Sequence, residues 1–392
     1  MKKDEKIFGF EKNIFFLSLV SFFTDVSSEM IYPLLPIFLT SVLGAGAAFV
    51  GLVEGVAEST SSLLKLFSGW LSDRLNRRKT LVAIGYTLSS LMRPLIAAAT
   101  AGWHVLIVRF LDRTGKGIRT APRDALIADC CDACDRGRAF GFNRAMDHAG
   151  AVAGPLIAFF LLHFVTTSYR TVFWLAFIPA VIAVLVVLFA VEEKENITDC
   201  KPIPLKLTLK PYDRNFKFFI FTILLFTLGN SSDAFLILRA KEAGVSIALI
   251  PILWMVLHIV KMSSSLPGGI ISDRMGRRKT IISGWLIYSV VYFGFAYAGS
   301  RYQIWLLFAL YGIFFGLTEG AEKAFVADLV PAEIRGSAYG IYNFIIGIGA
   351  LPSSVVMGIL WQKFGAQTAF LFGALLALVS SFLLTTLIRN TR

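Results

Sequence analysis

The sequence predicts an all-α membrane protein with twelve transmembrane helices arranged as two pseudo-symmetric six-helix halves. Three observations predict this class. Hydrophobic residues make up 56% of the 392 residues and charged residues only 16%, whereas soluble domains carry about 25% charged residues. Long apolar runs recur along the chain, and a transmembrane helix needs about 20 such residues. The segment Gly69–Thr80 recurs 200 residues later as Gly269–Thr280.

Twelve apolar stretches are long enough to span a bilayer. We expect helices near residues 13–40, 46–71, 80–99, 103–128, 138–163, 171–191, 215–238, 247–271, 279–298, 302–328, 337–361 and 367–388. A polar segment that contains Glu192, Glu193 and several prolines divides them into two sets of six. The predicted domains are therefore an N-terminal half at 1–191, a cytoplasmic linker at 192–214 and a C-terminal half at 215–392.

Basic residues indicate the orientation, because cytoplasmic loops of membrane proteins are rich in Lys and Arg. The N-terminal lysines, both copies of the repeated loop, the linker and the C-terminal arginines fall on one side of the predicted membrane. We expect both termini to be cytoplasmic, in a bacterial inner membrane, with no cleaved signal peptide. The net charge of +12 has the same origin, so it does not indicate a nucleic-acid partner.

The internal repeat extends beyond the loop. Both loops share Gly, Ser-Asp-Arg and Arg-Arg-Lys-Thr. Ala128-Asp129 matches Ala327-Asp328, and Ser27-Ser28-Glu29 in the first span resembles Ser231-Ser232-Asp233 in the seventh. Each span of the first half thus resembles its counterpart in the second half, and parallel six-span repeats are typical of transporters.

These motifs resemble those of the major facilitator superfamily, in particular its bacterial twelve-span proton-coupled exporters. The Gly-x-x-x-Asp-Arg-x-x-Arg-Arg-Lys loop resembles the family signature, and Pro33-x-x-Pro36 resembles the end of span 1 in drug exporters. Gly150-x-x-x-Gly154-Pro155 resembles the antiporter motif, although Ala158-Phe159 stands where that motif prefers two glycines. The resemblance implies the fold of this family and transport by alternating access.

Span 4 departs from the family pattern. Arg109-Phe-Leu-Asp112-Arg113-Thr-Gly115 resembles Arg-x-x-Gln-Gly-x-Gly, with Asp112 in place of Gln and Arg113 in place of the first Gly. These two changes add charge where the family usually has neutral residues. They argue against ordinary drug specificity.

The resemblance also implies a gate. Asp73 and Asp273 are expected to meet a helix N-terminus of the opposite half, where an anion is favoured by about 0.3–1 kcal/mol. Glycines in span 5 permit close helix approach and its proline permits a bend. The alternative is that the loop charges only keep a turn solvated. The predicted gating residues are Gly69, Asp73, Arg74, Arg78, Asp273, Arg274, Gly150, Gly154 and Pro155.

Charged residues inside spans are costly in lipid and indicate function. In span 4, Arg109, Asp112, Arg113 and Lys116 lie on one face of the predicted helix. Arg suits carboxylate ligands because its guanidinium can make two parallel hydrogen bonds. The predicted substrate-binding residues are Glu54, Glu58, Arg109, Asp112, Arg113, Lys116, Asp233, Tyr339 and Tyr342.

Carboxylates in spans 1 and 5 are candidates for proton coupling. Burial and a neighbouring cation have opposite effects on the protonation of a carboxylate, so a change of surroundings can release or bind its proton. The candidates are Asp25, Glu29 and Asp147, with His148 as a relay. The alternative is that these charges neutralise one another and fix the helix packing.

We therefore predict a secondary active transporter, working as a proton-coupled exporter of a small polar or charged organic molecule such as an anionic metabolite or a siderophore. The alternatives are an importer or anion exchanger of the same fold, or a multidrug exporter. A membrane enzyme is disfavoured because the sequence has no nucleophile–base motif and no phosphate-binding loop. Cys131-x-x-Cys134 lacks a second pair of metal ligands. We expect no metal, no cofactor, and a monomer with protons, substrate and lipid as its partners.

Overall fold

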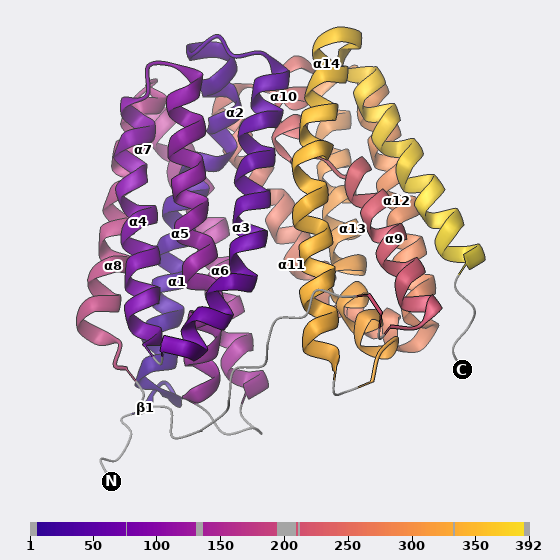
Figure 1. Cartoon of the computed structure of the whole chain (residues 1–392). Coiled ribbons are helices and arrows are strands. Elements are labelled where there is room, and N and C mark those ends of the chain that lie inside the picture. Colours follow the sequence, from indigo (N-terminus) through magenta and orange to yellow (C-terminus); the bar gives the residue numbers. More distant parts are fainter. Residues whose placement is uncertain are drawn as a thin grey trace. The chain divides into compact units, whose positions relative to one another are not determined.

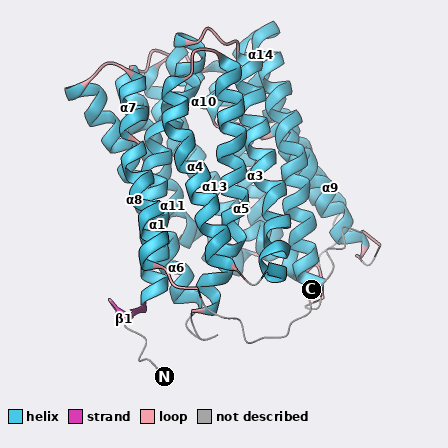
Figure 2. Cartoon of the chain, turned by 60° about the vertical axis from the view of Figure 1, so that its left-hand side comes forward, coloured by secondary structure: helices cyan, strands magenta, loops and turns pink. Residues whose placement is uncertain are grey.

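The computed structural model describes residues 6–75, 77–130, 136–193, 209–210, 212–331 and 334–387. Each predicted span corresponds to a helical segment, so the expected all-α class is confirmed; residue 388, the predicted end of the last span, lies outside the described residues. The segment before the first helix was predicted without strands. Strands β1 (Lys6–Ile7) and β2 (Phe10–Glu11) form a small antiparallel hairpin before the first helix (Figure 2).

The first six spans contain eight α-helices and three short helical turns among the residues that the structure describes. These elements are α1 (Lys12–Ile31), η1 (Tyr32–Leu34), α2 (Leu35–Ile37), η2 (Phe38–Val42), α3 (Ala47–Leu75), α4 (Arg78–Ala98), α5 (Gly102–Asp129), α6 (Arg136–Phe160), η3 (Leu161–Val165), α7 (Tyr169–Leu175) and α8 (Phe177–Ala190).

The last six spans follow the same order with one clear difference. Their elements are α9 (Arg214–Gly229), α10 (Ala234–Glu242), η4 (Ile247–Leu249), α11 (Ile250–Met275), α12 (Arg277–Tyr297), α13 (Arg301–Asp328) and α14 (Arg335–Leu387). The seventh span is broken into α9 and α10 by a non-helical segment at 230–233, whereas α1 is continuous. Helix α14 contains spans 11 and 12, which join at Gly365, where φ is +87°.

Nine of the described helical segments are long and apolar enough to cross a membrane by themselves. Helices α3 and α5 are not among them although both are long enough. Helix α5 carries the charged stripe, and such side chains are tolerated inside a membrane protein when they face its interior.

The helices form two compact units. The first contains residues 1–35 and 60–204, and the second contains 36–59 and 205–392. In the first unit α1 packs on α6 and α8, and α4 packs on α5; in the second, α11 packs on α13 and α12 packs on α13 and α14 (Figure 1). The predicted division at 192–214 stays a prediction, because most of that segment lies outside the described residues.

The internal repeat is visible in contacts that the two units share, although the offset between matching residues varies from 194 to 199. The hydroxyl of Ser90 donates to the carbonyl of Ala180 (3.1 Å), and that of Ser289 donates to the carbonyl of Ala374 (2.8 Å). Likewise Arg78 pairs with Asp129 at the ends of α4 and α5, and Arg277 pairs with Asp328 (2.6 Å) at the ends of α12 and α13. Equivalent positions of the two units can therefore be compared directly.

Candidate functional site

Three arginines surround one aspartate inside the first unit. The carboxylate of Asp112 on α5 lies 3.4 Å from Arg93 Nη2 on α4. It also lies 3.5 Å from Arg109 Nη1 and 3.8 Å from Arg113 Nε, both on α5. Arg93, Arg109 and Asp112 are at most 4% exposed. We call these four residues the arginine cluster.

Polar and aromatic groups hold the arginine cluster in place. Arg93 Nη2 donates a hydrogen bond to Ser28 Oγ on α1 (2.8 Å). Ser89 Oγ donates to the backbone carbonyl of Asp112 (3.0 Å) and accepts from Arg119 Nη1 (2.5 Å). The guanidinium of Arg119 also lies over the Tyr86 ring, 4.4 Å from its centroid. The cluster thus ties α4, α5 and α1 together.

The four residues of the arginine cluster are three cations and one anion. Three guanidinium groups share one carboxylate, and Arg119 adds a fourth cation nearby. Buried charges are costly unless they are paired and hydrogen-bonded. Arg93 Nε is buried and has no hydrogen-bond partner among the described residues. This arrangement suits an anionic ligand, because guanidinium groups bind carboxylates and phosphates well.

Arg93 was missed in the sequence analysis, although a signal was present. It is the one charged residue between Leu81 and Ala98, and an ionisable residue inside an apolar span is a functional candidate by default.

A second charged group joins α1, α5 and α6. Arg123 Nη1 lies 3.9 Å from the Asp147 carboxylate and donates to Ser21 Oγ on α1 (2.9 Å). Arg144 Nη1 lies 3.7 Å from Asp147. Asp25 is within electrostatic range of Asp147, Glu29, Lys116 and Arg123. The structure thus brings together three of the four predicted proton-coupling residues, and His148 is half-buried beside Asp147 in sequence.

The glycines of α6 let it approach α1 at the two carboxylates of span 1. A Cβ atom on Gly150 would lie 2.6 Å from the carbonyl oxygen of Phe22 and 2.9 Å from Asp25 Cβ. A Cβ atom on Gly154 would lie 2.9 Å from Glu29 Cβ. Distances this short are not tolerated, so both positions require glycine while the helices are this close. Pro155 follows inside the same helix.

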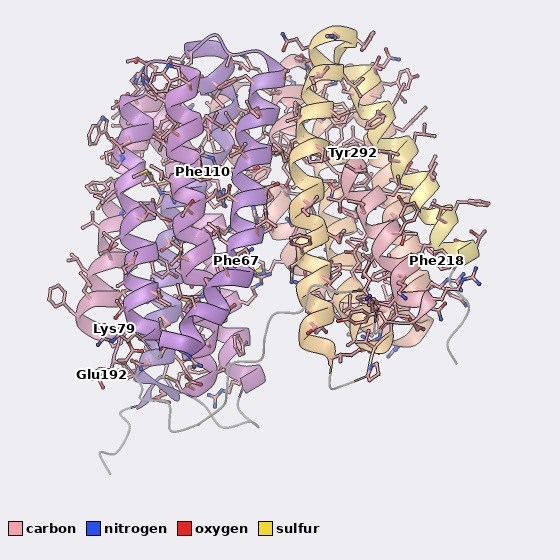
Figure 3. The ribbon with its side chains drawn as sticks, viewed as in Figure 1. Phe67, Lys79, Phe110, Glu192, Phe218 and Tyr292 are labelled. Carbon is pink, nitrogen blue, oxygen red and sulfur yellow. The ribbon has the colours of Figure 1, made fainter. Side chains whose placement is uncertain are left out.

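The second unit has an aromatic site instead of an arginine cluster. Tyr311 donates a hydrogen bond to the Asp233 carboxylate (2.7 Å). The Tyr288 hydroxyl donates to the Gly229 carbonyl (2.9 Å), and the Tyr288 and Tyr292 rings stack at 4.0 Å. Tyr292 lies among the helices of this unit (Figure 3).

Glu322 on α13, in the second unit, was not predicted as a site residue. Its carboxylate has two hydrogen-bond donors. It accepts hydrogen bonds from Trp285 Nε1 (2.9 Å) and from the predicted residue Tyr342 (2.8 Å). Tyr339 donates to the carbonyl of Lys323 (3.0 Å). Of the remaining predicted substrate residues, Glu54 is buried and Glu58 is exposed on α3, and Lys116 is half-buried on α5.

The predicted gate is only partly described. The side chains of Gly69, Asp73 and Arg74 lie outside the described residues. Arg78 pairs with Asp129, as given above. Asp273 is exposed in the last turn of α11 and lies 3.8 Å from Arg277, and Arg274 is in the same turn. The proposed contact of Asp73 and Asp273 with the opposite half stays a prediction.

Comparison with known proteins identifies the family. The sequence matches the family described as the Major Facilitator Superfamily over residues 17–264 and 218–392. It is 37% identical to an uncharacterized MFS-type transporter of Methanocaldococcus jannaschii, over 98% of this chain and 96% of that one. The chain belongs to the Major Facilitator Superfamily. It is a multi-pass membrane transporter of that family, as the repeated loops predicted.

Other relatives of this superfamily member are more distant. The multidrug resistance protein MdtH of Cronobacter sakazakii is 24% identical over 86% of this chain and 83% of its own length. The crystal structure of the nucleoside transporter NupG has a TM-score of 0.81 at 16% identity, covering 96% of this chain and 99% of that one. At that identity the likeness shows the superfamily fold alone.

Proposed function

We propose that this superfamily member is a secondary active transporter that exports a small organic anion by alternating access. The observation that carries the proposal is the arginine cluster, in which three guanidinium groups share one carboxylate inside the first unit. Guanidinium groups bind carboxylates through paired hydrogen bonds, so an anionic metabolite or a siderophore with carboxylate groups suits these residues. Glycine packing of α6 on α1 resembles the antiporter motif and favours export.

The proposed coupling ion is the proton. Asp25 and Asp147 lie within electrostatic range of each other and of Arg123. They are on α1 and α6, whose close approach Gly150 and Gly154 permit. Substrate binding, or a helix movement that separates these groups, would change which of them binds a proton. The proposed setting is a monomer in the bacterial cytoplasmic membrane with both termini on the cytoplasmic side.

A second candidate is multidrug export, favoured by the likeness to proteins named MdtH. A lipophilic cation would need acidic partners, and Glu54 and Glu58 on α3 are candidates. The arginine cluster in the first unit favours an anion instead. Because the similar proteins are transporters, the superfamily relation also favours transport over a membrane enzyme.

The test is proton movement in proteoliposomes that contain a pH-sensitive dye. The protein is challenged with organic carboxylates, siderophores and cationic drugs, with protein-free liposomes as the control. Proton flux that depends on an organic anion supports the proposal, and its sign gives the direction. Flux with cationic drugs alone would support multidrug export. Anion uptake without proton movement would indicate a uniporter or an anion exchanger.

A further inference from the structure

The non-helical segment at 230–233 interrupts the seventh span between α9 and α10. Inside a membrane, non-helical backbone is tolerated only where protein or a polar cavity surrounds it. In transporters, broken helices mark ion and substrate sites, since the exposed carbonyls and the C-terminal end of the first half-helix favour a cation. The equivalent segment of α1 is continuous, so this break is specific to the second unit.

Three buried hydroxyl groups around the break lack hydrogen bonds among the described residues. They belong to Ser231 in the break itself, Tyr292 on α12 and Ser353 on α14. Ser353 directly precedes Ser354, whose hydroxyl accepts a hydrogen bond from the Ser232 N–H in the break (3.3 Å). The Tyr292 hydroxyl lies near those of Ser231, Tyr288 and Tyr311 without hydrogen-bond geometry to any of them. Buried polar atoms are nearly always satisfied in folded proteins, and a group that lacks a protein partner indicates a bound water or ion.

Asp233 supplies one negative charge at the same place. Its carboxylate accepts a hydrogen bond from Tyr311 but makes no ion pair among the residues that the structure describes. It also does not cap α10, although it is the N-cap residue of that helix. The nearest cation, Lys261, acts on Asp233 at longer range, and its ammonium lies over the Phe315 ring, 3.4 Å from the centroid. Glu54 and Glu58, in the same unit, contribute further negative potential at Asp233.

The internal repeat shows which residues occupy the equivalent positions in the first unit. Tyr292 lies 199 residues after Arg93, and Tyr311 lies 199 residues after Asp112. In the first unit the guanidinium of Arg93 reaches Ser28, the counterpart of Ser232, and pairs with Asp112. The second unit has neutral tyrosines at both positions. The second unit therefore has no cation at the position that Arg93 occupies in the first unit.

We propose that the break in the seventh span binds a single monovalent cation of the size of Na⁺. Asp233 contributes the negative charge, and the hydroxyls of Ser231, Ser353 and Tyr292 contribute neutral oxygen ligands. Hard cations prefer oxygen ligands, and one carboxylate balances one positive charge. Three unsatisfied hydroxyls favour a metal ion over a proton, because a proton needs only one acceptor. The site is separate from the arginine cluster and does not depend on the proposed anion substrate.

The test is thermal unfolding of the purified full-length protein without substrate, as Na⁺ replaces choline at constant chloride concentration and pH. A ligand that binds the folded state raises the unfolding midpoint in a saturable way. We expect Na⁺ to raise the midpoint and K⁺ to do so less. Asp233→Asn should abolish the Na⁺ response. Ser353→Ala and Tyr292→Phe should each raise the half-saturating Na⁺ concentration roughly tenfold or more.

The matched control is Ser381→Ala, which removes another buried hydroxyl of α14, one that donates to the carbonyl of Ala377 (2.8 Å). It should leave the Na⁺ response unchanged. Equal midpoints in Na⁺ and choline for the wild type, or an unchanged response in Asp233→Asn, would overturn the proposal. If Asp233→Asn does not fold, an unchanged half-saturation in Ser353→Ala and Tyr292→Phe overturns it equally. Transport assays are not involved, so this result is independent of the proposed function.

Discussion

The guanidinium group of Arg93 lies 3.4 Å from the carboxylate of Asp112, and this pair joins α4 to α5 deep inside the first unit. The same guanidinium group donates to Ser28, so α1 is held by the same contact. Arg109 and Arg113 approach the same carboxylate from α5. One aspartate therefore lies near three arginines, and guanidinium groups are suited to an anionic ligand.

Asp112→Asn should destabilise the protein and increase its dependence on anions. Removing one partner of a buried ion pair typically costs about 3–5 kcal/mol, because the remaining charges are uncompensated. We expect a lower unfolding midpoint for Asp112→Asn in detergent, and a larger rise in that midpoint on adding the anionic substrate than the wild type shows. A midpoint equal to that of the wild type would show that Asp112 does not balance the arginines.

Gly150→Ala and Gly154→Ala should each disrupt the packing of α6 on α1. The added methyl group would lie within 2.6 Å of a carbonyl oxygen of α1 in both variants. Overpacking of this kind costs about 1–3 kcal/mol, so we expect lower unfolding midpoints and slower transport. Gly141→Ala, on the same helix, is the control because nothing lies within 4 Å of its added Cβ. If all three variants behave alike, the close approach is not important.

Asp25→Asn and Asp147→Asn should each separate proton flux from substrate exchange. Either change removes a titratable group from the α1–α6 interface while keeping a side chain of nearly the same shape. We expect substrate exchange to continue and substrate-driven proton movement to stop, measured with the pH-sensitive dye. Asp124→Asn is the control, because its carboxylate also contacts Arg123 (2.9 Å) but the residue belongs to α5 and its side chain is 43% exposed. Full proton flux in both variants would place the proton site elsewhere.

Asp73→Asn should slow turnover more than it weakens substrate binding. A carboxylate at a helix N-terminus is worth about 0.3–1 kcal/mol, which corresponds to a roughly two- to fivefold change in rate. Asp73→Glu keeps the charge and should preserve most of the turnover. The measurement is the initial transport rate across substrate concentrations. Equal turnover and equal affinity in wild type and Asp73→Asn would contradict the gating role of Asp73.

The sequence predicted the spans well because apolar runs and basic loops depend only on local composition. It could not show the break at 230–233, since Asn230, Ser231 and Ser232 are polar but can all occur in a transmembrane helix. The β1–β2 hairpin was missed because two-residue strands leave no alternating pattern. The stripe on α5 was found from its helical spacing. Its pairing with Arg93 depends on how α4 packs on α5, which no pattern within one span reveals.

The most direct test of the account is the affinity for an organic anion in wild type, Arg113→Gln and Arg301→Gln. Arg113 is the most open arginine of the cluster, with 13% of its side chain exposed. Loss of a charge-assisted hydrogen bond costs about 1.5–3 kcal/mol, so Arg113→Gln should weaken binding roughly 10- to 150-fold. Arg301→Gln removes an exposed charge at the start of α13 and should bind like the wild type. A folded Arg113→Gln variant with unchanged affinity would contradict the assignment of the arginine cluster to the substrate.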